Sequence, residues 1–206
     1  MKEIALSQVI GNAKAFNLTI LPHEEVSLVD DVQDGDLDLT FEVQESAAFA
    51  YVLKVRDNSS TTPLGRSITV ILTGRDAHAN VRCLLYGDAA RVFKIKTMQE
   101  HIASNATSNV VIKAVLDDSA RLTCHSMIRV APGANGTNAE QVNKNILLSS
   151  GARAVSIPML EVLANDVKCK HGAAVSRLND EQMFYLQSRG ICPAQTRTML
   201  LEAFLT

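Results

Sequence analysis

The pattern of this sequence changes at one stretch, Asp166-Val167-Lys168-Cys169-Lys170-His171-Gly172-Ala173. Short strand-like segments precede it, and two helix-like segments follow it. If the stretch is a strand, alternation places Val167, Cys169 and His171 on one face. Cys169 and His171 then lie roughly 6–7 Å apart, because each strand residue advances about 3.3 Å. Two such donors can bind a metal without completing its site, or can be core or interface residues, and spacing alone leaves both readings open.

Composition bounds the class of protein. A chain of 206 residues fits one domain, or one domain with a small appendage, and 47% hydrophobic residues are enough for a core. The formal net charge is -2, no Lys/Arg cluster occurs and there is no Trp, so a nucleic-acid interface is not expected. Residues 1–10 lack a signal-peptide pattern, no run of apolar residues is long enough to span a membrane, and the four cysteines are scattered. We therefore expect a cytoplasmic protein without disulfides.

Apolar residues from Glu3 to about Leu163 mostly recur with a period near two, as in Leu37–Val43 and Val110–Leu116. Turn-forming pieces such as Asp57–Ser60 separate these segments. No segment before residue 178 shows a helical period. The sequence therefore predicts a mainly β body over residues 1–177 and a small helical module over residues 178–206.

A weak repeat favours a solenoid. Each copy has a Leu, a few small or polar residues, an Ala and then a new strand; the copies are Leu72–Ala77, Leu85–Ala89, Leu116–Ala120 and Leu148–Ala152. The last two copies are 32 residues apart and the middle two are 31 apart, which is in the range of coil-type repeats and favours a parallel β-helix. An antiparallel sandwich uses similar turns, so this alternative stays open.

In the C-terminal module, Asn179 is expected to cap a first helix, Gly190 to end it and Pro193 to start a second one. The second helix has an apolar stripe that includes Leu200 and Leu205. Helices this short need tertiary packing. They either pack on the β body or present an apolar surface to another protein.

The other cysteines, together with His101 and His125, are not expected to form a functional site. Cys83 and Cys124 are expected in the core, His125 faces outward, His101 faces solvent, and Cys192 is a cap or a surface thiol.

Alternation also places three amides, Gln141, Asn143 and Asn145, on one strand face, where they can bond neighbouring coils. Nucleotide-binding loops and hydrolase signatures are absent from the sequence, so we do not expect an enzyme.

Four motifs resemble those of the SufB/SufD family of iron–sulfur cluster assembly scaffolds. In order they are Glu140–Ser149, Pro158–Val162, Asn165–Ala173 and Asp180–Ile191. The Lys-Cys-x-His-Gly-Ala and Phe-Tyr-Leu-x-Ser-Arg-Gly runs look more like SufD than SufB. The chain is shorter than typical members at its N-terminus, and a rough alignment places Ala152 where SufB-type members carry a cluster-binding Cys.

The resemblance implies a right-handed parallel β-helix followed by a helical module that docks a SufC-type ABC ATPase. It implies edge-to-edge pairing of two β-helices, as a homodimer or with a SufB/SufD-type paralogue, and a transient iron–sulfur cluster near that edge. His171 would be a ligand and Cys169 a second donor. The ATPase-docking residues expected in the module are Phe184, Tyr185, Arg189, Gly190, Leu200, Leu201 and Phe204.

Two other functions remain open at this point. The chain could be a structural or interaction protein of the same family without cluster chemistry. It could also be a β-helix enzyme acting on polysaccharides, which the low aromatic content of 4% disfavours.

Overall fold

The computed structural model describes residues 2–56 and 62–206. The turn expected at Asp57–Ser60 lies outside the described residues. Strands dominate the chain: β1 Lys2–Ala5, β2 Ala15–Ile20, β3 Glu25–Asp30, β4 Gly35–Val43, β5 Ala48–Val55, β6 Leu64–Leu72, β7 His78–Gly87, β8 Val92–His101, β9 Thr107–Leu116, β10 Arg121–Val130, β11 Thr137–Leu147, β12 Arg153–Val162 and β13 Val167–Ser176.

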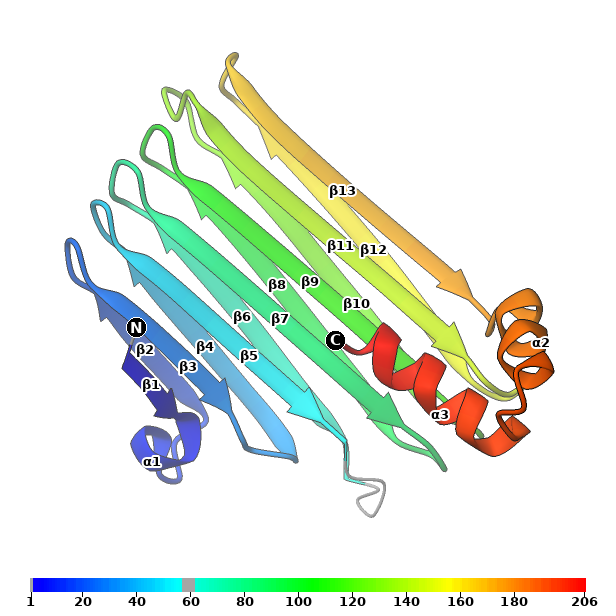
Figure 1. Cartoon of the computed structure of the whole chain (residues 1–206). Helices are drawn as coiled ribbons and strands as arrows, with labels where there is room; N and C mark the ends of the chain where they lie inside the picture. Colours follow the sequence, from blue (N-terminus) through cyan, green and yellow to red (C-terminus); the bar gives the residue numbers. More distant parts are fainter. Residues whose placement is uncertain (1, 57–61) are drawn as a thin grey trace.

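The strands form two facing sheets, and the chain passes from one sheet to the other at every corner (Figure 1). Odd-numbered strands make a 7-stranded sheet, and even-numbered strands make a 6-stranded sheet. Each strand pairs in parallel with the strand one coil before it or after it. The predicted parallel β-helix is therefore confirmed, and the antiparallel sandwich is excluded.

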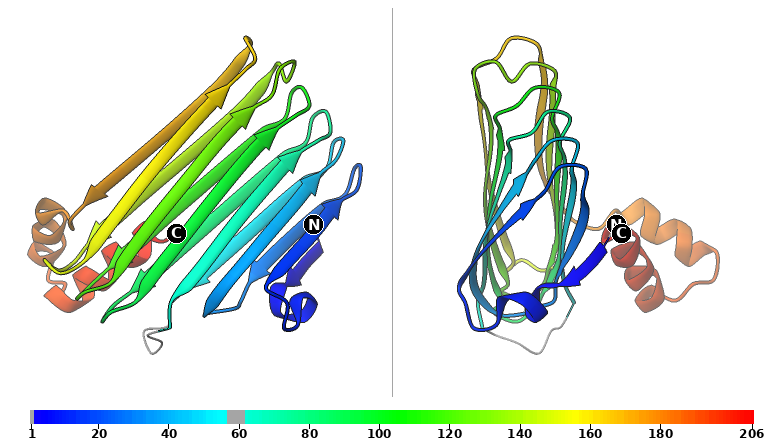
Figure 2. Two further views of the ribbon diagram at one scale, coloured as in Figure 1. Left: turned by 180° about the vertical axis from the view of Figure 1, so that it is seen from behind. Right: turned by 90° about the vertical axis from the view of Figure 1, so that its left-hand side faces the viewer.

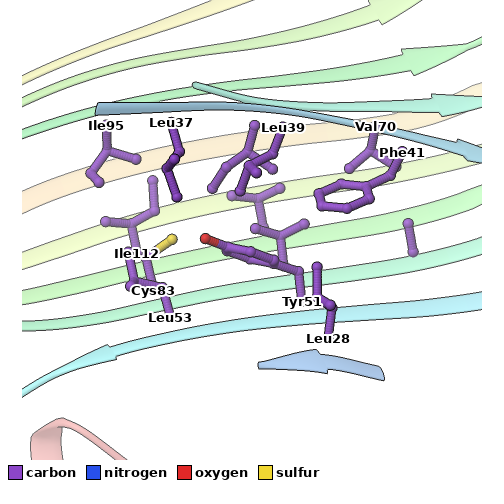
Figure 3. Packing of buried hydrophobic residues seen from close by; sticks show 14 of the residues in the cluster. Leu28, Leu37, Leu39, Phe41, Tyr51, Leu53, Val70, Cys83, Ile95 and Ile112 are labelled. Carbon is purple, nitrogen blue, oxygen red and sulfur yellow. The ribbon is translucent and has the colours of Figure 1, made fainter. Parts of the chain in front are cut away.

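The core lies between the two sheets. Strand residues alternate between buried and more exposed positions, and the inward side chains of both sheets meet in one apolar cluster. Figure 3 shows this packing, with Leu37 and Leu39 of one sheet facing Leu53 and Ile112 of the other. The period-two pattern of the sequence thus reports one buried face per strand.

All four predicted repeats lie at corners between strands, but Ala89, between β7 and β8, is exposed, unlike the alanines of the other three. Ala120 and Ala152 are buried at the same corner of successive coils, between β9 and β10 and between β11 and β12. Ala77 is buried at the opposite corner, between β6 and β7. A methyl group fits at these tight corners, where a larger side chain would crowd the neighbouring coil.

The two ends of the solenoid differ. A short helix, α1 Leu6–Ile10, closes the N-terminal end and buries Leu6 and Ile10 against the core. The sequence predicted no helix here, because five residues are too few to show a helical period. At the other end, β12 and β13 have no strand partner on their outer side among the described residues.

The helical module lies on the outer side of the 7-stranded sheet (Figure 2). Helix α2 Asp180–Ser188 is capped by Asn179, whose side chain accepts the backbone N–H groups of Glu181 and Gln182, as predicted. Helix α3 Pro193–Phe204 begins at the predicted proline. It packs on β7, β9 and β11, whereas α2 projects away from the sheets. The first alternative for the module is therefore confirmed for α3, which packs on the β body, while Phe184 and Tyr185 of α2 are exposed.

Candidate functional site

Cys169 and His171 lie on β13, the last strand of the 7-stranded sheet. Their register partners on β11 are Ala139 and Gln141, which both point into the solenoid. The predicted shared face is therefore confirmed, and it is the inner face. Cys169 packs on the apolar cluster around Ile128, while His171 is exposed.

Burial raises the pKa of the Cys169 thiol, and a backbone hydrogen bond from Ala139 opposes the rise. The thiol is therefore mostly protonated at neutral pH, and a metal must displace its proton to bind.

Cys169 and His171 alone are too few ligands for a complete metal site. Among the described residues no group of three or more His, Cys, Asp or Glu side chains comes together. Tetrahedral sites for iron or zinc use about four ligands. Cys169 and His171 thus amount to half of a ligand set, placed where the solenoid stops.

The open end is also apolar. Leu160 of β12 lies directly above the buried Ile128, yet its own side chain is 43% exposed because no further coil covers it. Val162 and Val175 face the same opening and are exposed as well. Inward-facing leucine and valine at a strand edge are typical of a surface that pairs with another strand.

The three amides expected on one face, Gln141, Asn143 and Asn145, are buried inside the last coils. Asn143 donates its side-chain N–H to Ser156 Oγ at 2.8 Å. Ser156 belongs to the opposite sheet, so this bond crosses the interior instead of following the neighbouring coil. The shared face was predicted correctly, and the bond clamps the two sheets together beside the opening.

His101 corrects an expectation. It is fully buried on the inner face of β8, with Nε2 at 2.7 Å from Ser108 Oγ, and does not face solvent. The polar neighbours Gln99 and Glu100 suggested an exposed segment, but Gln99 is buried too, and it donates to the same hydroxyl. Burial lowers the pKa of His101 from 6.5 to about 4.

This buried imidazole predicts a loss of stability in acid. Below pH 6.5 the unfolded chain takes up a proton that the folded chain refuses, so the stability present above pH 6.5 falls as the pH drops towards 4. The loss should reach about 3 kcal/mol for this group. Urea unfolding at pH 7 and pH 4.5 should show a flatter pH dependence for His101→Gln than for the parent. His78→Gln, at an exposed position, is the control, and equal slopes for all three chains would contradict the prediction.

The other three cysteines lie in the core or on the surface and not beside Cys169 and His171. Cys83 and Cys124 are buried core residues, as expected, and burial raises the pKa of both thiols. Cys192 is exposed at the start of α3 and makes no cap hydrogen bond, so it is a surface thiol. Ala152 is buried in a corner, so no donor stands at the position where a Cys was sought.

The expected docking residues divide between the two helices. On α2, Phe184 is 74% exposed and Tyr185 is exposed beside Arg189, whose guanidinium lies 5.3 Å from the tyrosine ring. Gly190 follows with φ of 89°, the left-handed conformation predicted for it.

On α3, Leu201 and Phe204 pack on the solenoid, and Phe204 lies over Lys113. Leu200 faces α2 and lines a shallow groove with Tyr185 and Leu186. Of the seven expected residues, Leu201 is buried and Leu200 and Phe204 are partly buried, whereas Phe184, Tyr185, Arg189 and Gly190 on or beside α2 are exposed. None of the described helices is long and apolar enough to cross a lipid bilayer.

Comparison with known proteins identifies relatives. The family model described as "SUF system FeS cluster assembly, SufBD core domain" matches residues 45–204. The iron–sulfur cluster assembly protein SufD of Escherichia coli is 35% identical over 133 residues, which is 65% of this chain and 31% of that protein. A SufBD family protein of Synechocystis is 38% identical over 100 residues, covering 48% of this chain and 22% of the relative.

A further SufBD family protein, from Mycobacterium leprae, is 33% identical over 146 residues, which is 67% of this chain and 37% of the relative. The chain therefore spans between 22% and 37% of the length of these three relatives.

Proposed function

This chain belongs to the SufBD family of the SUF system, and on that premise we propose that it is a scaffold component in iron–sulfur cluster assembly. The cluster is its cargo, held briefly and passed on. Cys169 and His171 would supply the thiolate and imidazole ligands. The chain itself would not be the catalyst, and ATP hydrolysis would belong to a SufC-type ABC ATPase partner.

The observation that carries the proposal is the position of the two donors. Both are inner-face residues of the strand that ends the solenoid, and within the described part of the chain they belong to no group of three or more His, Cys, Asp or Glu side chains. Edge-to-edge pairing with a second solenoid would cover Leu160 and Val162 and would bring a second pair of donors to the same opening. Pairing would therefore bury the exposed apolar end and would also complete the ligand set. The partner would be a second copy of this chain or a SufB/SufD-type paralogue.

Anaerobic reconstitution with iron and sulfide tests the ligands. The parent chain should develop charge-transfer absorbance, and His171→Ala and Cys169→Ala should each lower the iron bound per chain by at least about half, since each removes one of few ligands. Cys192→Ala is the matched control, because it removes an exposed thiol away from the opening. Iron binding that survives in both His171→Ala and Cys169→Ala, or that falls equally in Cys192→Ala, would contradict the assignment of Cys169 and His171 as ligands.

We place the ATPase contact on α2. Phe184 and Tyr185 form an exposed aromatic pair on a helix that projects from the solenoid. Exposed aromatic residues of this kind are frequent anchors of protein interfaces.

Phe184→Asp should weaken ATPase binding by at least about 30-fold, because loss of an anchor costs about 2 kcal/mol or more. Calorimetric titration with the purified ATPase measures this. Leu21→Asp, at an apolar residue that is also exposed and lies near the N-terminal end of the solenoid, should leave binding unchanged. A Phe184→Asp chain that binds with the parent affinity would place the contact elsewhere. Phe204 is a poorer choice for this test, since it also anchors α3.

A further inference from the structure

A row of three methionines crosses the outer face of the 6-stranded sheet. Met127 of β10 is the register partner of Met98 on β8 and of Met159 on β12. Neighbouring strands lie about 4.8 Å apart, and side chains in register on parallel strands stand side by side. Half of the six methionines in the chain therefore form one continuous row of thioethers.

A histidine stands beside this row. His125 precedes Met127 by two residues on β10 and so shares its outward face, as the sequence predicted for His125. The structure shows one hollow of about 240 Å³ that is lined by His125, Met98, Met127 and Met159 together. Three thioether sulfurs and one imidazole therefore border the same space.

This donor set has a narrow chemical preference. Thioethers and neutral imidazole carry no charge, and thioether sulfur is a soft ligand that selects Cu(I) over hard cations such as Mg²⁺ or Ca²⁺. Methionine side chains have three rotatable bonds, so sulfurs on adjacent strands can converge on one ion. We propose that this outer face binds a single soft monovalent cation, Cu(I), through Met98, Met127, Met159 and His125.

The surrounding charges are compatible with a cation. Lys96 also lines the hollow, and its ammonium group opposes a positive ion there. On the other side of the methionine row, Arg129 lies between Glu100 and Glu161, at 3.2 and 3.5 Å from their carboxylate oxygens. Two carboxylates against one guanidinium leave a net negative charge that offsets Lys96.

The competing explanation is an apolar contact surface, since Val155 and Ile157 are exposed next to Met159 on the same strand. Methionine and leucine are close in size and apolar character, so Met→Leu changes preserve an apolar surface and the fold. They remove the sulfur. The two explanations therefore separate cleanly, because only the metal site depends on the sulfur atoms.

The test uses the full chain carrying Cys169→Ser and Cys192→Ser, because cysteine side chains that are not buried also bind Cu(I). Methionine methyl groups labelled with ¹³C are followed by NMR during titration with Ag(I), a redox-inert soft cation. Up to one equivalent, the signals of Met98, Met127 and Met159 should shift while those of Met183 and Met199 stay in place. Cu(I) affinity, measured without oxygen by competition with a chromophoric chelator, should fall at least tenfold in Met127→Leu and in His125→Ala.

Met199→Leu is the matched control. Met199 is exposed on α3, which packs on the 7-stranded sheet and not on the sheet that carries the methionine row, so this variant should bind Cu(I) as the parent does. The proposal is overturned if no methionine signal moves at one equivalent, or if all methionine signals move alike. It is also overturned if the chain with all three Met→Leu changes keeps the parent affinity, which would assign Cu(I) to the buried thiols of Cys83 and Cys124. None of these outcomes bears on iron reconstitution at the open end.

Discussion

Arg66→Met is expected to lower the free energy of unfolding by about 3–5 kcal/mol, because it leaves a charged carboxylate buried without its partner. Arg66 and Asp30 are both 0% exposed, and Arg66 Nε lies 2.5 Å from Asp30 Oδ2. The guanidinium also donates to the carbonyl oxygens of Val32, Gly35 and Gly65. It therefore ties strands β3, β4 and β6 together. Urea unfolding of the parent and the variant measures the loss.

Two further variants make this prediction specific. Tyr51 donates to Asp30 Oδ2 at 2.5 Å, and Tyr51→Phe should cost only about 1–3 kcal/mol because the ion pair survives. The double variant Arg66→Met with Asp30→Leu removes both charges and should be more stable than Arg66→Met alone. A loss below about 1 kcal/mol in Arg66→Met, or no recovery in the double variant, would contradict the role of the ion pair.

Leu160→Asp is expected to prevent pairing of two solenoids. Its side chain sits in the open end above Ile128, and a carboxylate there would have to lose its water in the paired state. We expect the dissociation constant of the pair to rise at least about 30-fold, the effect of losing an interface anchor. Sedimentation equilibrium measures it over a range of concentrations.

The fold of the Leu160→Asp chain should be preserved, because the residue is already 43% exposed in the single chain. Leu21→Asp, at the opposite end of the solenoid, is the control and should pair like the parent. If Leu160→Asp pairs with unchanged affinity, the open end is not the pairing surface.

Much of this fold follows from local patterns. Segments such as Val110–Leu116 were recognisable as strands, because each buries one face and therefore alternates. Whether such strands pair in parallel depends on how the chain connects one strand to its neighbour in the sheet, which alternation does not encode. The repeated corners at Ala120 and Ala152 carried that information only weakly, and the resemblance to the SufB/SufD family supplied the rest.

Two features, helix α1 and the burial of His101, were not predicted from the sequence, and each has a physical cause. Helix α1 is too short to show periodicity and owes its place to the burial of Leu6 and Ile10 on the core. His101 was expected in solvent because its neighbours are polar, but the interior of the late coils is itself polar around Ser108. Tertiary burial outweighed the character of the local sequence.

The candidate site was also predictable only in part. The shared face of Cys169 and His171 was predictable from spacing, whereas their position at an uncovered end depends on which strand finishes the sheet. The row of Met98, Met127 and Met159 was hidden for a similar reason. Its members stand one coil apart in the sequence, and only the register of three parallel strands brings them side by side.

We propose that the cluster needs donors from two solenoids that meet at the open end. The most direct measurement is the iron and sulfide bound per chain after anaerobic reconstitution of the Leu160→Asp variant, in which Cys169 and His171 are both intact. This unpaired chain should bind little iron compared with the parent, while Leu21→Asp should bind as much as the parent. Full iron and sulfide content on an unpaired Leu160→Asp chain would show that one solenoid suffices and would contradict the need for pairing.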